Sequence, residues 1–492
     1  MRFPGISAHR LRSGLGLLLL SCTLLTQCKS KPDETPTPNP PVPPTPPTAG
    51  PSQVALWLTT TDQSALFQKS TLALNFLAPV GQNPTIVVDT TQTFQGIDGF
   101  GYTLTGGSAQ LLNQLPAANR TTLLRELFGT DAGSIGVSYL RISIGASDLS
   151  SREFTYNDLP GGQTDPTLAR FSLEPERADL LPVLREILQI NPDLKILGSP
   201  WTAPTWMKTN GSFVGGSLKP EFYDVYARYF VKYLQQMQAE GVRLDAITIQ
   251  NEPLNPYNNP SMLMTAAEQG NFIKNNLGPA LQAAGLTTKI ILYDHNTDRT
   301  DYPLAILADP QVSRYVDGSA FHLYAGNINA MSQVHNAFPA KSVYFTEQWV
   351  GGPGNFAADF TWHINNLIIG GTRNWSRNVL EWNLAADQNY GPHTNGGCST
   401  CLGALTINGN TVSRNTAYYT VAHAAKFVRP GSVRIGSTTP GSLTNVAFKA
   451  PNGQKVLIVQ NTSGTTQAFD IQYRGKAAST TLPAGAVGTY VW

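Results

Sequence analysis

Two glutamates, Glu252 and Glu347, stand where a pair of carboxyl groups could cleave a glycosidic bond. Each follows a short apolar run within three residues, one run ending near Ile249 and the other near Phe345. Glycoside hydrolysis needs one carboxyl group to protonate the leaving oxygen and a second to attack the sugar or activate water. A single carboxylate at such a place is more often a helix cap or a surface ion pair. The interpretation therefore depends on a fold that brings the two together.

Eight short apolar runs alternate with longer amphipathic segments between Gly96 and Phe427, which is typical of repeated strand-helix units. This count predicts an α/β protein, a (β/α)8 barrel over residues 96–427. An open doubly wound sheet would need a glycine-rich phosphate turn, which Gly96–Gly101 does not provide. The runs end near Phe100, Ile144, Leu197, Ile249, Tyr293, Leu323, Phe345 and Trp382.

Polar and aromatic side chains follow these runs, at the strand ends where barrel enzymes carry their reactive groups. Trp201 and Trp382 could stack on the C–H face of a sugar, although isolated tryptophans are usually core residues. His322 could equally be a core histidine, and Asn251 a turn residue before a proline. The side chains at the strand ends are Arg141, Asp148, Trp201, Asn251, Glu252, Asp294, His295, His322, Tyr324, Glu347, Trp382 and Asn383.

The segment Thr248–Pro253, with Asn251-Glu252-Pro253 at its end, resembles the acid/base motif of the large clan of retaining (β/α)8 glycosidases. Within that clan the chain is similar to glycoside hydrolase family 30, which contains glucosylceramidases and endo-β-1,6-glucanases. Further matching stretches occur in family order: Gly96–Thr105, Leu140–Ser150, Gly198–Asn210, Phe321–Tyr324, Phe345–Gln348 and Trp382–Ala385.

The resemblance implies a role for each matching residue. Glu252 would be the acid/base and Glu347 the nucleophile, with carboxyl groups about 5–5.5 Å apart, as retention of configuration requires. In the resting enzyme Glu252 would be protonated and Glu347 ionised. No metal or cofactor is implied. The resemblance assigns substrate binding or support of the nucleophile to Arg141, Trp201, Asn251, His322, Tyr324 and Trp382.

The substrate suggested by this resemblance is β-1,6-glucan or a glucosylceramide-like β-glucoside, with endo or exo action left open. Two features resemble the glucanase branch more than the lysosomal enzymes: glycines rather than an acidic residue at Gly106 and Gly107, and a loop with Cys398 and Cys401. Outside the cytoplasm, this cysteine spacing favours a short disulfide over a zinc site.

Two other functions compete with hydrolysis. A non-catalytic cell-surface glycan-binding protein could use the same barrel, but such proteins typically lose a catalytic carboxylate, and both are present here. Phosphate-ester or Schiff-base chemistry would need a phosphate loop or a lysine at a strand end. Lys208 and Lys341 do not stand at such positions.

The N-terminal segment predicts export. Arg10 and Arg12 precede the apolar run Leu15–Leu25, which is the order of a secretory signal and is too short for a transmembrane helix. The signal would end at a lipobox with Cys28 as the acylated residue; Cys22 is the competing site, and an ordinary cleaved signal is the alternative. Residues 29–52 are rich in Pro and Thr and predict an extended linker. We expect a lipoprotein of the periplasm or cell surface, attached to the membrane only by this anchor.

Segments 53–95 and 428–492 predict strands of one accessory β-sandwich built from both ends of the chain. The pair Asn452-Gly453 predicts a hairpin between two of them. The net charge of +2, without basic blocks, indicates no nucleic-acid partner, and we expect a monomer. The expected C-terminal strands are Leu443–Lys449, Val456–Gln460, Phe469–Tyr473 and Gly488–Val491.

Overall fold

The computed structural model describes residues 52–79 and 81–492. The predicted signal at 1–28, both candidate lipidation residues Cys22 and Cys28, and nearly all of the linker at 29–52 lie outside the described residues. Among the helices that the structure does describe, none combines the length and apolar character needed to cross a membrane.

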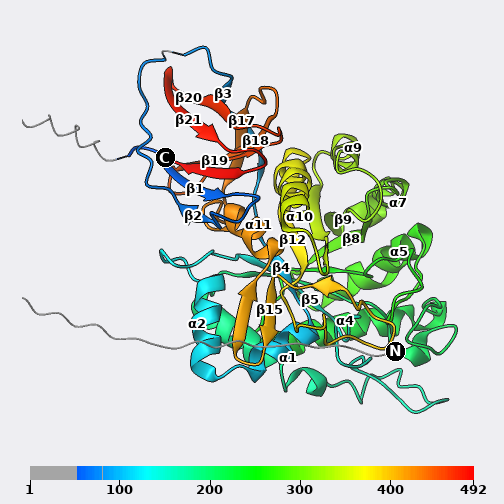
Figure 1. The fold of residues 1–492 in the computed structure, drawn as a ribbon. Helices are drawn as coiled ribbons and strands as arrows, with labels where there is room; N and C mark the ends of the chain where they lie inside the picture. Colours follow the sequence, from blue (N-terminus) through cyan, green and yellow to red (C-terminus); the bar gives the residue numbers. More distant parts are fainter. Residues whose placement is uncertain (1–51, 80) are drawn as a thin grey trace, which may run out of the picture. The chain divides into compact units, whose positions relative to one another are not determined.

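Eight parallel strands close into a barrel, which confirms the predicted (β/α)8 fold (Figure 1). Around the barrel the order is β10-β12-β4-β5-β6-β7-β8-β9, so each strand pairs with its neighbours in the chain and the first pairs with the last. The strands are β4 (Gly99–Leu104), β5 (Tyr139–Ser143), β6 (Lys195–Ser199), β7 (Ala246–Thr248), β8 (Lys289–Asn296), β9 (Val316–His322), β10 (Ser342–Glu347) and β12 (Ser376–Asn383).

The helices between these strands bury their apolar sides against the barrel. The helix that begins after Thr265 has a capping box, because the Thr265 hydroxyl accepts from the Glu268 amide and the Glu268 carboxylate accepts from the Thr265 amide. The main helices are α1 (Gly106–Gln114), α2 (Ala117–Phe128), α3 (Leu180–Ile190), α4 (Tyr223–Ala239), α5 (Ala266–Phe272), α6 (Gly278–Ala283), α7 (Asp301–Leu307), α9 (Ala330–Ala337), α10 (Phe356–His363) and α11 (Thr416–Ala425).

Strand residues that point inward fill the barrel as a packed layer. Gly101 allows the first two strands to approach each other closely, because a Cβ there would lie 1.8 Å from the carbonyl oxygen of Tyr139 on the neighbouring strand. The packed layer closes the barrel below the polar strand ends. Its members are Tyr139, Leu197, Ala246, Ile291, Ala320, Tyr344 and Leu380.

Strands from both ends of the chain form the accessory β-domain, as predicted (Figure 1). The hairpin at Asn452-Gly453 joins β18 to β19, and Gly453 takes a φ of 87° that its missing side chain allows. The N-terminal strands are β1 (Ala55–Thr59), β2 (Gln68–Lys69) and β3 (Thr85–Gly96); the C-terminal strands are β17 (Val433–Ser437), β18 (Leu443–Lys449), β19 (Lys455–Asn461), β20 (Gln467–Tyr473), β21 (Lys476–Leu482) and β22 (Val487–Val491).

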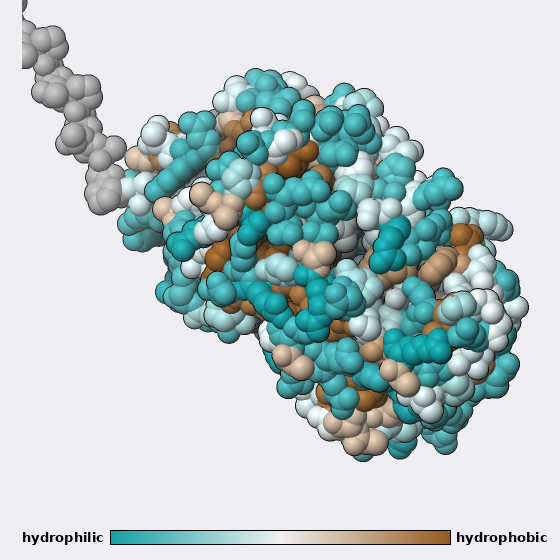
Figure 2. Space-filling model, turned by 90° about the horizontal axis from the view of Figure 1, so that it is seen from below, coloured by the Kyte–Doolittle hydropathy of each residue, from teal (hydrophilic) through white to brown (hydrophobic). Residues whose placement is uncertain are grey.

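His423 ties helix α11 of the barrel to this β-domain. Its two ring nitrogens each lie 2.8 Å from a threonine hydroxyl, one on Thr59 of β1 and one on Thr489 of β22. Burial lowers the pKa of His423 to about 3, so the ring is neutral at ordinary pH. Figure 2 shows a mainly hydrophilic surface with hydrophobic residues in small separate patches, as expected when the apolar side chains fill the interior.

Candidate active site

The two predicted glutamates meet at the carboxyl ends of the barrel strands. Glu347 is the last residue of β10, and Glu252 follows β7 by four residues. One carboxylate oxygen of each and a ring nitrogen of His322 all lie within 4.8 Å of one another. Both side chains are buried but reach solvent, with 9% of Glu252 and 6% of Glu347 exposed. The spacing lies near the about 5–5.5 Å of retaining enzymes and below the about 6.5–9.5 Å of inverting ones.

Two donors hold the Glu347 carboxylate. The guanidinium of Arg141, on β5, forms an ion pair with Oε2, and the hydroxyl of Tyr324 donates to Oε1 at 3.0 Å. Arg141 is completely buried and stacks beneath Trp201, with its Cζ 4.8 Å from the ring centroid. Donors on both oxygens fix the orientation of the carboxylate and favour its ionised form.

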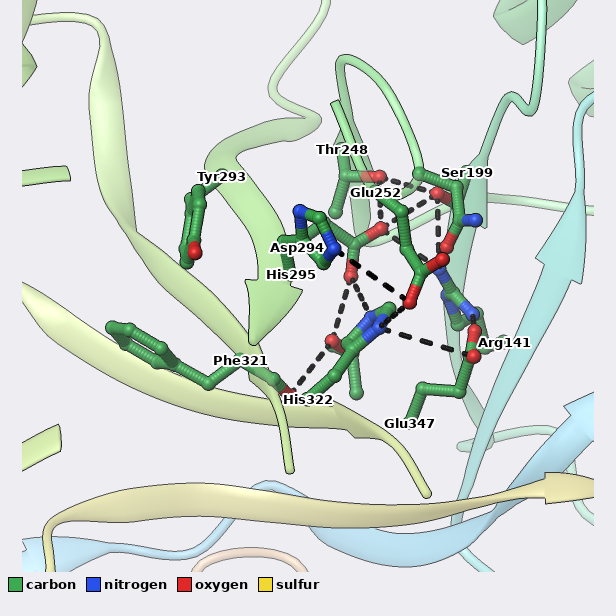
Figure 3. Close-up of polar contacts among 12 residues, drawn as sticks. Arg141, Ser199, Thr248, Glu252, Tyr293, Asp294, His295, Phe321, His322 and Glu347 are labelled. Carbon is green, nitrogen blue, oxygen red and sulfur yellow. Dashed lines mark hydrogen bonds and ion pairs between the residues drawn. The ribbon is translucent and has the colours of Figure 1, made fainter. Parts of the chain in front are cut away.

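Asp294, on β8, is buried at the centre of the hydrogen-bond network of the site (Figure 3). Although burial opposes its charge, Arg141 and His322 hold the pKa of Asp294 well below its usual range. The sequence placed this residue at a strand end without giving it a role. Its carboxylate accepts from the hydroxyls of Ser199, Thr248 and Thr346 at 2.7 Å each, from Arg141 at 2.8 Å and from Nε2 of His322 at 3.1 Å.

His322 lies between Asp294 and Glu252. Its ring is 0% exposed, and its Nδ1 is 3.2 Å from Oε1 of Glu252. The other oxygen of Glu252 accepts from Nδ2 of Asn255 at 2.7 Å. Both ring nitrogens of His322 therefore face carboxylates, and its expected contact with a sugar stays a prediction.

The pKa shifts of the two glutamates bear on the expectation that Glu252 carries the proton. Burial would raise the pKa of Glu252, but the hydrogen bond and charge of His322 lower it to about 2. Burial raises the pKa of Glu347, and His322 and Arg141 only partly offset this. His322 has a pKa raised to about 9, because the charge of Glu347 and the bonds to its other partners outweigh burial. Both glutamate shifts therefore run opposite to the charges expected for the resting enzyme.

The backbone is strained where these residues meet. Glu252, Tyr293 and Asp294 have φ values of 45°, 74° and 66°, in the left-handed region that side chains disfavour. The Glu252 amide donates to the Asp294 carbonyl at 3.0 Å, which holds the two strand ends together. Such strain is typical of functional sites, where the surroundings fix a reactive side chain.

Trp201 and Trp382 pack against each other at the strand ends, with ring centroids 5.4 Å apart. Both are nearly fully buried, with 1% and 3% exposed. Asn251 also reaches the site, where its Oδ1 accepts from Arg141 at 2.7 Å. Since an arginine only donates, this contact fixes the side-chain amide of Asn251 with its NH2 group free to bond elsewhere.

Asp148 was noted at a strand end but was not predicted to belong to the site. Burial, followed by the charges of Glu347 and Glu252, raises the pKa of Asp148 to about 7. A carboxyl group whose pKa is raised in this way lies within electrostatic reach of the two glutamates. The sequence did not predict that Asp148 lies near the two glutamates, because it is far from both along the chain. Its position just after the second strand could have indicated it.

The loop after β12 holds Asp148 in place. Cys398 and Cys401 form a disulfide there, and the Thr394 amide and hydroxyl donate to the Asp148 carbonyl at 2.9 and 3.3 Å. Gly107 allows this approach, because a Cβ there would lie 2.7 Å from the carbonyl oxygen of Leu149 and 2.9 Å from that of Pro392. The glycines after the first strand therefore make room for the Asp148 segment and the cysteine loop.

Glu252, His322 and Glu347 also form the one group of acidic and histidine side chains with metal-ligand spacing in the described part of the chain. Other side chains already engage each of them: Asn255 donates to Glu252, Arg141 and Tyr324 donate to Glu347, and the Asp294 carboxylate accepts from His322. The arrangement therefore fits proton transfer between these groups.

Comparison with known proteins assigns the family. The model of the glycosyl hydrolase family 30 TIM-barrel domain matches residues 97–428, and that of the family 30 β-sandwich domain matches residues 431–490. The chain belongs to glycoside hydrolase family 30. Membership in family 30 makes it a glycosidase acting on β-glycosides, which confirms the predicted enzyme class.

Relatives within family 30 include both predicted branches. The endo-1,6-β-D-glucanase neg1 of Aspergillus fumigatus is 38% identical over 426 residues, which cover 81% of this chain and 85% of that protein. The lysosomal acid glucosylceramidase of Mus musculus is 29% identical over 81% of each chain. The solved structure of an endo-β-1,6-glucanase superimposes with a TM-score of 0.84 at 35% identity, covering 89% of this chain and 99% of that one.

Proposed function

We propose that the chain hydrolyses β-1,6-linked glucan with retention of configuration. The observation that carries the proposal is the close approach of Glu252 and Glu347, whose nearest oxygens lie within 4.8 Å. The glucan is favoured over a glucosylceramide-like lipid because the glucanase relative is 38% identical and the glucosylceramidase 29%, over the same share of this chain. A glycan-binding protein without activity is disfavoured, since both carboxyl groups are present and connected to donors.

In the first step Glu347 attacks the anomeric carbon and forms a glycosyl ester. Arg141 and Tyr324 orient the carboxylate for this attack. The glycosidic bond breaks, and the leaving oxygen takes a proton from Glu252.

In the second step water breaks the ester. Glu252, now ionised, accepts a proton from the water as it attacks the anomeric carbon. Glu347 leaves as a carboxylate and regains the bonds from Arg141 and Tyr324. The site returns to its starting charge, with no cofactor in the cycle.

Four further side chains would bind the reacting sugar. Asn251 would donate its free NH2 group to the 2-hydroxyl, a contact that strengthens as the ring flattens. Trp201 and Trp382 would provide apolar walls. Asp148 would accept from sugar hydroxyls, because its buried carboxyl group lies within electrostatic reach of the two glutamates.

The test is hydrolysis of β-1,6-glucan, glucosylceramide and an aryl β-glucoside by the wild type and by Glu252→Gln and Glu347→Gln. Glu174→Gln is the matched control, because the Glu174 side chain is 77% exposed. We expect glucan cleavage with retained configuration, lost in both site variants and kept in the control. Preference for glucosylceramide would reverse the substrate assignment, and binding without cleavage would support the glycan-binding alternative.

We further propose that the enzyme works outside the cytoplasm as a monomer, anchored through acylated Cys28. The support is the order of charges, apolar run and cysteine in residues 1–28. Cys28→Ser should release the protein from membranes of its host, whereas Cys22→Ser should not. Release by Cys22→Ser alone would move the anchor to Cys22, and release by neither would favour an ordinary cleaved signal.

A further inference from the structure

We infer that Tyr257 forms an aromatic platform for the sugar unit on the leaving-group side of the cleaved bond. The departing glucose rests its C–H face on this ring while Glu252 protonates the oxygen that joins it to the reacting sugar. Tyr257 is thus a specificity-determining residue for leaving groups that are themselves sugars. The inference deepens the proposed function and rests on it.

Tyr257 is the most exposed large hydrophobic side chain in the described part of the chain, with 86% of its surface open to solvent. It lies in the loop 253–264, which directly follows the acid/base and in which every other residue is buried or partly buried. An aromatic ring left in water forgoes the free energy that its burial would supply. A ring held out in this way, beside a reactive carboxyl group, is available to a ligand.

Asn255 fixes the position of Tyr257 relative to the acid/base. Its Nδ2 donates to Oε2 of Glu252 at 2.7 Å, and its Oδ1 accepts from the backbone amide of Tyr257 at 3.3 Å. Because a backbone amide only donates, the two ends of the Asn255 side chain cannot be exchanged. One carboxamide group therefore separates the Tyr257 backbone from the carboxyl group of Glu252, which leaves the ring within reach of a sugar attached to the cleaved oxygen.

The loop that carries Tyr257 is held at its base from two sides. Asn259 donates its Nδ2 to the carboxylate of Glu153, in the loop after β5, at 2.6 Å. On the other side Lys208, in the loop after β6, donates its Nζ to the carbonyl of Ser261 at 2.7 Å. Since these contacts already order the loop, a sugar that binds to the ring does not have to order it.

The groups around the reacting sugar indicate which side of the cleaved bond Tyr257 serves. Trp201 and Trp382, the apolar walls of the reacting sugar, pack against each other with ring centroids 5.4 Å apart. Tyr257 instead connects to the site through Asn255 and Glu252. Because the acid delivers its proton to the leaving oxygen, a platform beside the acid lies next to the sugar that departs.

The test compares two substrates that share the reacting glucose and differ in what leaves. A β-1,6-linked gluco-oligosaccharide places a sugar against Tyr257, whereas β-glucosyl fluoride releases only a fluoride ion. We expect Tyr257→Ala to lower kcat/KM about tenfold on the oligosaccharide and much less on the fluoride, because stacking is lost only with the first. Tyr257→Phe keeps the ring and should retain most of the wild-type value on both. The matched control is Leu77→Ala, a side chain of the β-domain that is 67% exposed, and it should change neither value.

A second measurement uses the glycosyl ester that the fluoride forms. A hydroxyl of an added β-1,6-linked glucobiose can replace water: its oxygen bonds to the anomeric carbon, its proton passes to Glu252, and the ester bond to Glu347 breaks. The acceptor occupies the position of the leaving group, so Tyr257→Ala should lower the ratio of transfer to hydrolysis about tenfold.

Four results would overturn the inference: an unchanged kcat/KM of Tyr257→Ala on the oligosaccharide, equal losses on both substrates, a Phe variant as impaired as the Ala variant, or an unchanged transfer ratio. A wild type that turns over neither substrate would contradict the proposed function instead. Calorimetry of oligosaccharide binding to the wild type and to Tyr257→Ala would then decide, and equal affinities would overturn the inference as well.

Discussion

Replacing Tyr324 by Phe tests how the charge of the nucleophile is held. The hydroxyl donates to Oε1 of Glu347 at 3.0 Å, and the ring can remain in place without it. A hydrogen bond to a charged group contributes about 1.5–3 kcal/mol. Tyr324 is 38% exposed, so water can partly replace the hydroxyl, and we take the lower value. About 1.5 kcal/mol corresponds to roughly a tenfold change in rate or in an equilibrium constant.

The loss in Tyr324→Phe should fall on the second step. The bond stabilises the Glu347 carboxylate, which is consumed in the first step and released in the second. We expect kcat for a dinitrophenyl β-glucoside, limited by hydrolysis of the ester, to fall about tenfold, with kcat/KM preserved. The acid limb of kcat/KM should move up by about one pH unit, because Glu347 loses a donor to its charged form. An equal fall in both constants, or an unmoved acid limb, would refute this reasoning.

Three other perturbations have definite expected results. Asp148→Asn should raise KM for the glucan about tenfold or more through lost bonds to sugar hydroxyls, with an unchanged melting temperature; an unchanged KM would remove Asp148 from the binding site. Opening the disulfide with Cys398→Ser and Cys401→Ser should lower kcat/KM on the glucan while costing about 2 kcal/mol of stability or less, measured by urea unfolding; unaltered kinetics would contradict a role for the loop. His423 has its folded-state pKa lowered to about 3, so stability falls as the pH drops below about 6.5 and the unfolded chain binds the proton. His423→Gln should therefore reduce the difference in unfolding free energy between pH 7 and pH 5 by about 2 kcal/mol, and an unreduced difference would mean that the ring is charged when folded.

The barrel could be predicted from the sequence because its strands are buried on both sides. Parallel strands covered by helices form nearly continuous apolar runs, and all eight were found. Seven of the predicted runs end within three residues of a strand's carboxyl end, whereas the first ends at Phe100, near the start of β4. Strand β21 (Lys476–Leu482) was missed, because its Ala, Ser and Thr residues give little apolar contrast. The short pair β11 (Val350–Gly351) and β14 (Cys401–Leu402) was missed because two-residue strands leave no pattern.

The residues of the site could be predicted from strand order, but their mutual contacts could not. Glu252, Glu347 and Arg141 stand at strand ends, and a closed barrel brings strand ends together. Which group faces which depends on side-chain direction, so the position of His322 between Asp294 and Glu252 required the structure. The expectation that Glu252 holds the resting proton stays a prediction, because the 3.2 Å contact with His322 fits the proton on either partner.

The central claim is that Glu347 attacks the sugar, and trapping the glycosyl-enzyme tests it most directly. A 2-deoxy-2-fluoro β-glucoside with a good leaving group should form an ester that hydrolyses slowly enough for peptide mass spectrometry. We predict one added sugar on the peptide that contains Glu347, and none in Glu347→Gln. A sugar attached to another residue, or an enzyme that turns over without any covalent adduct, would contradict the account.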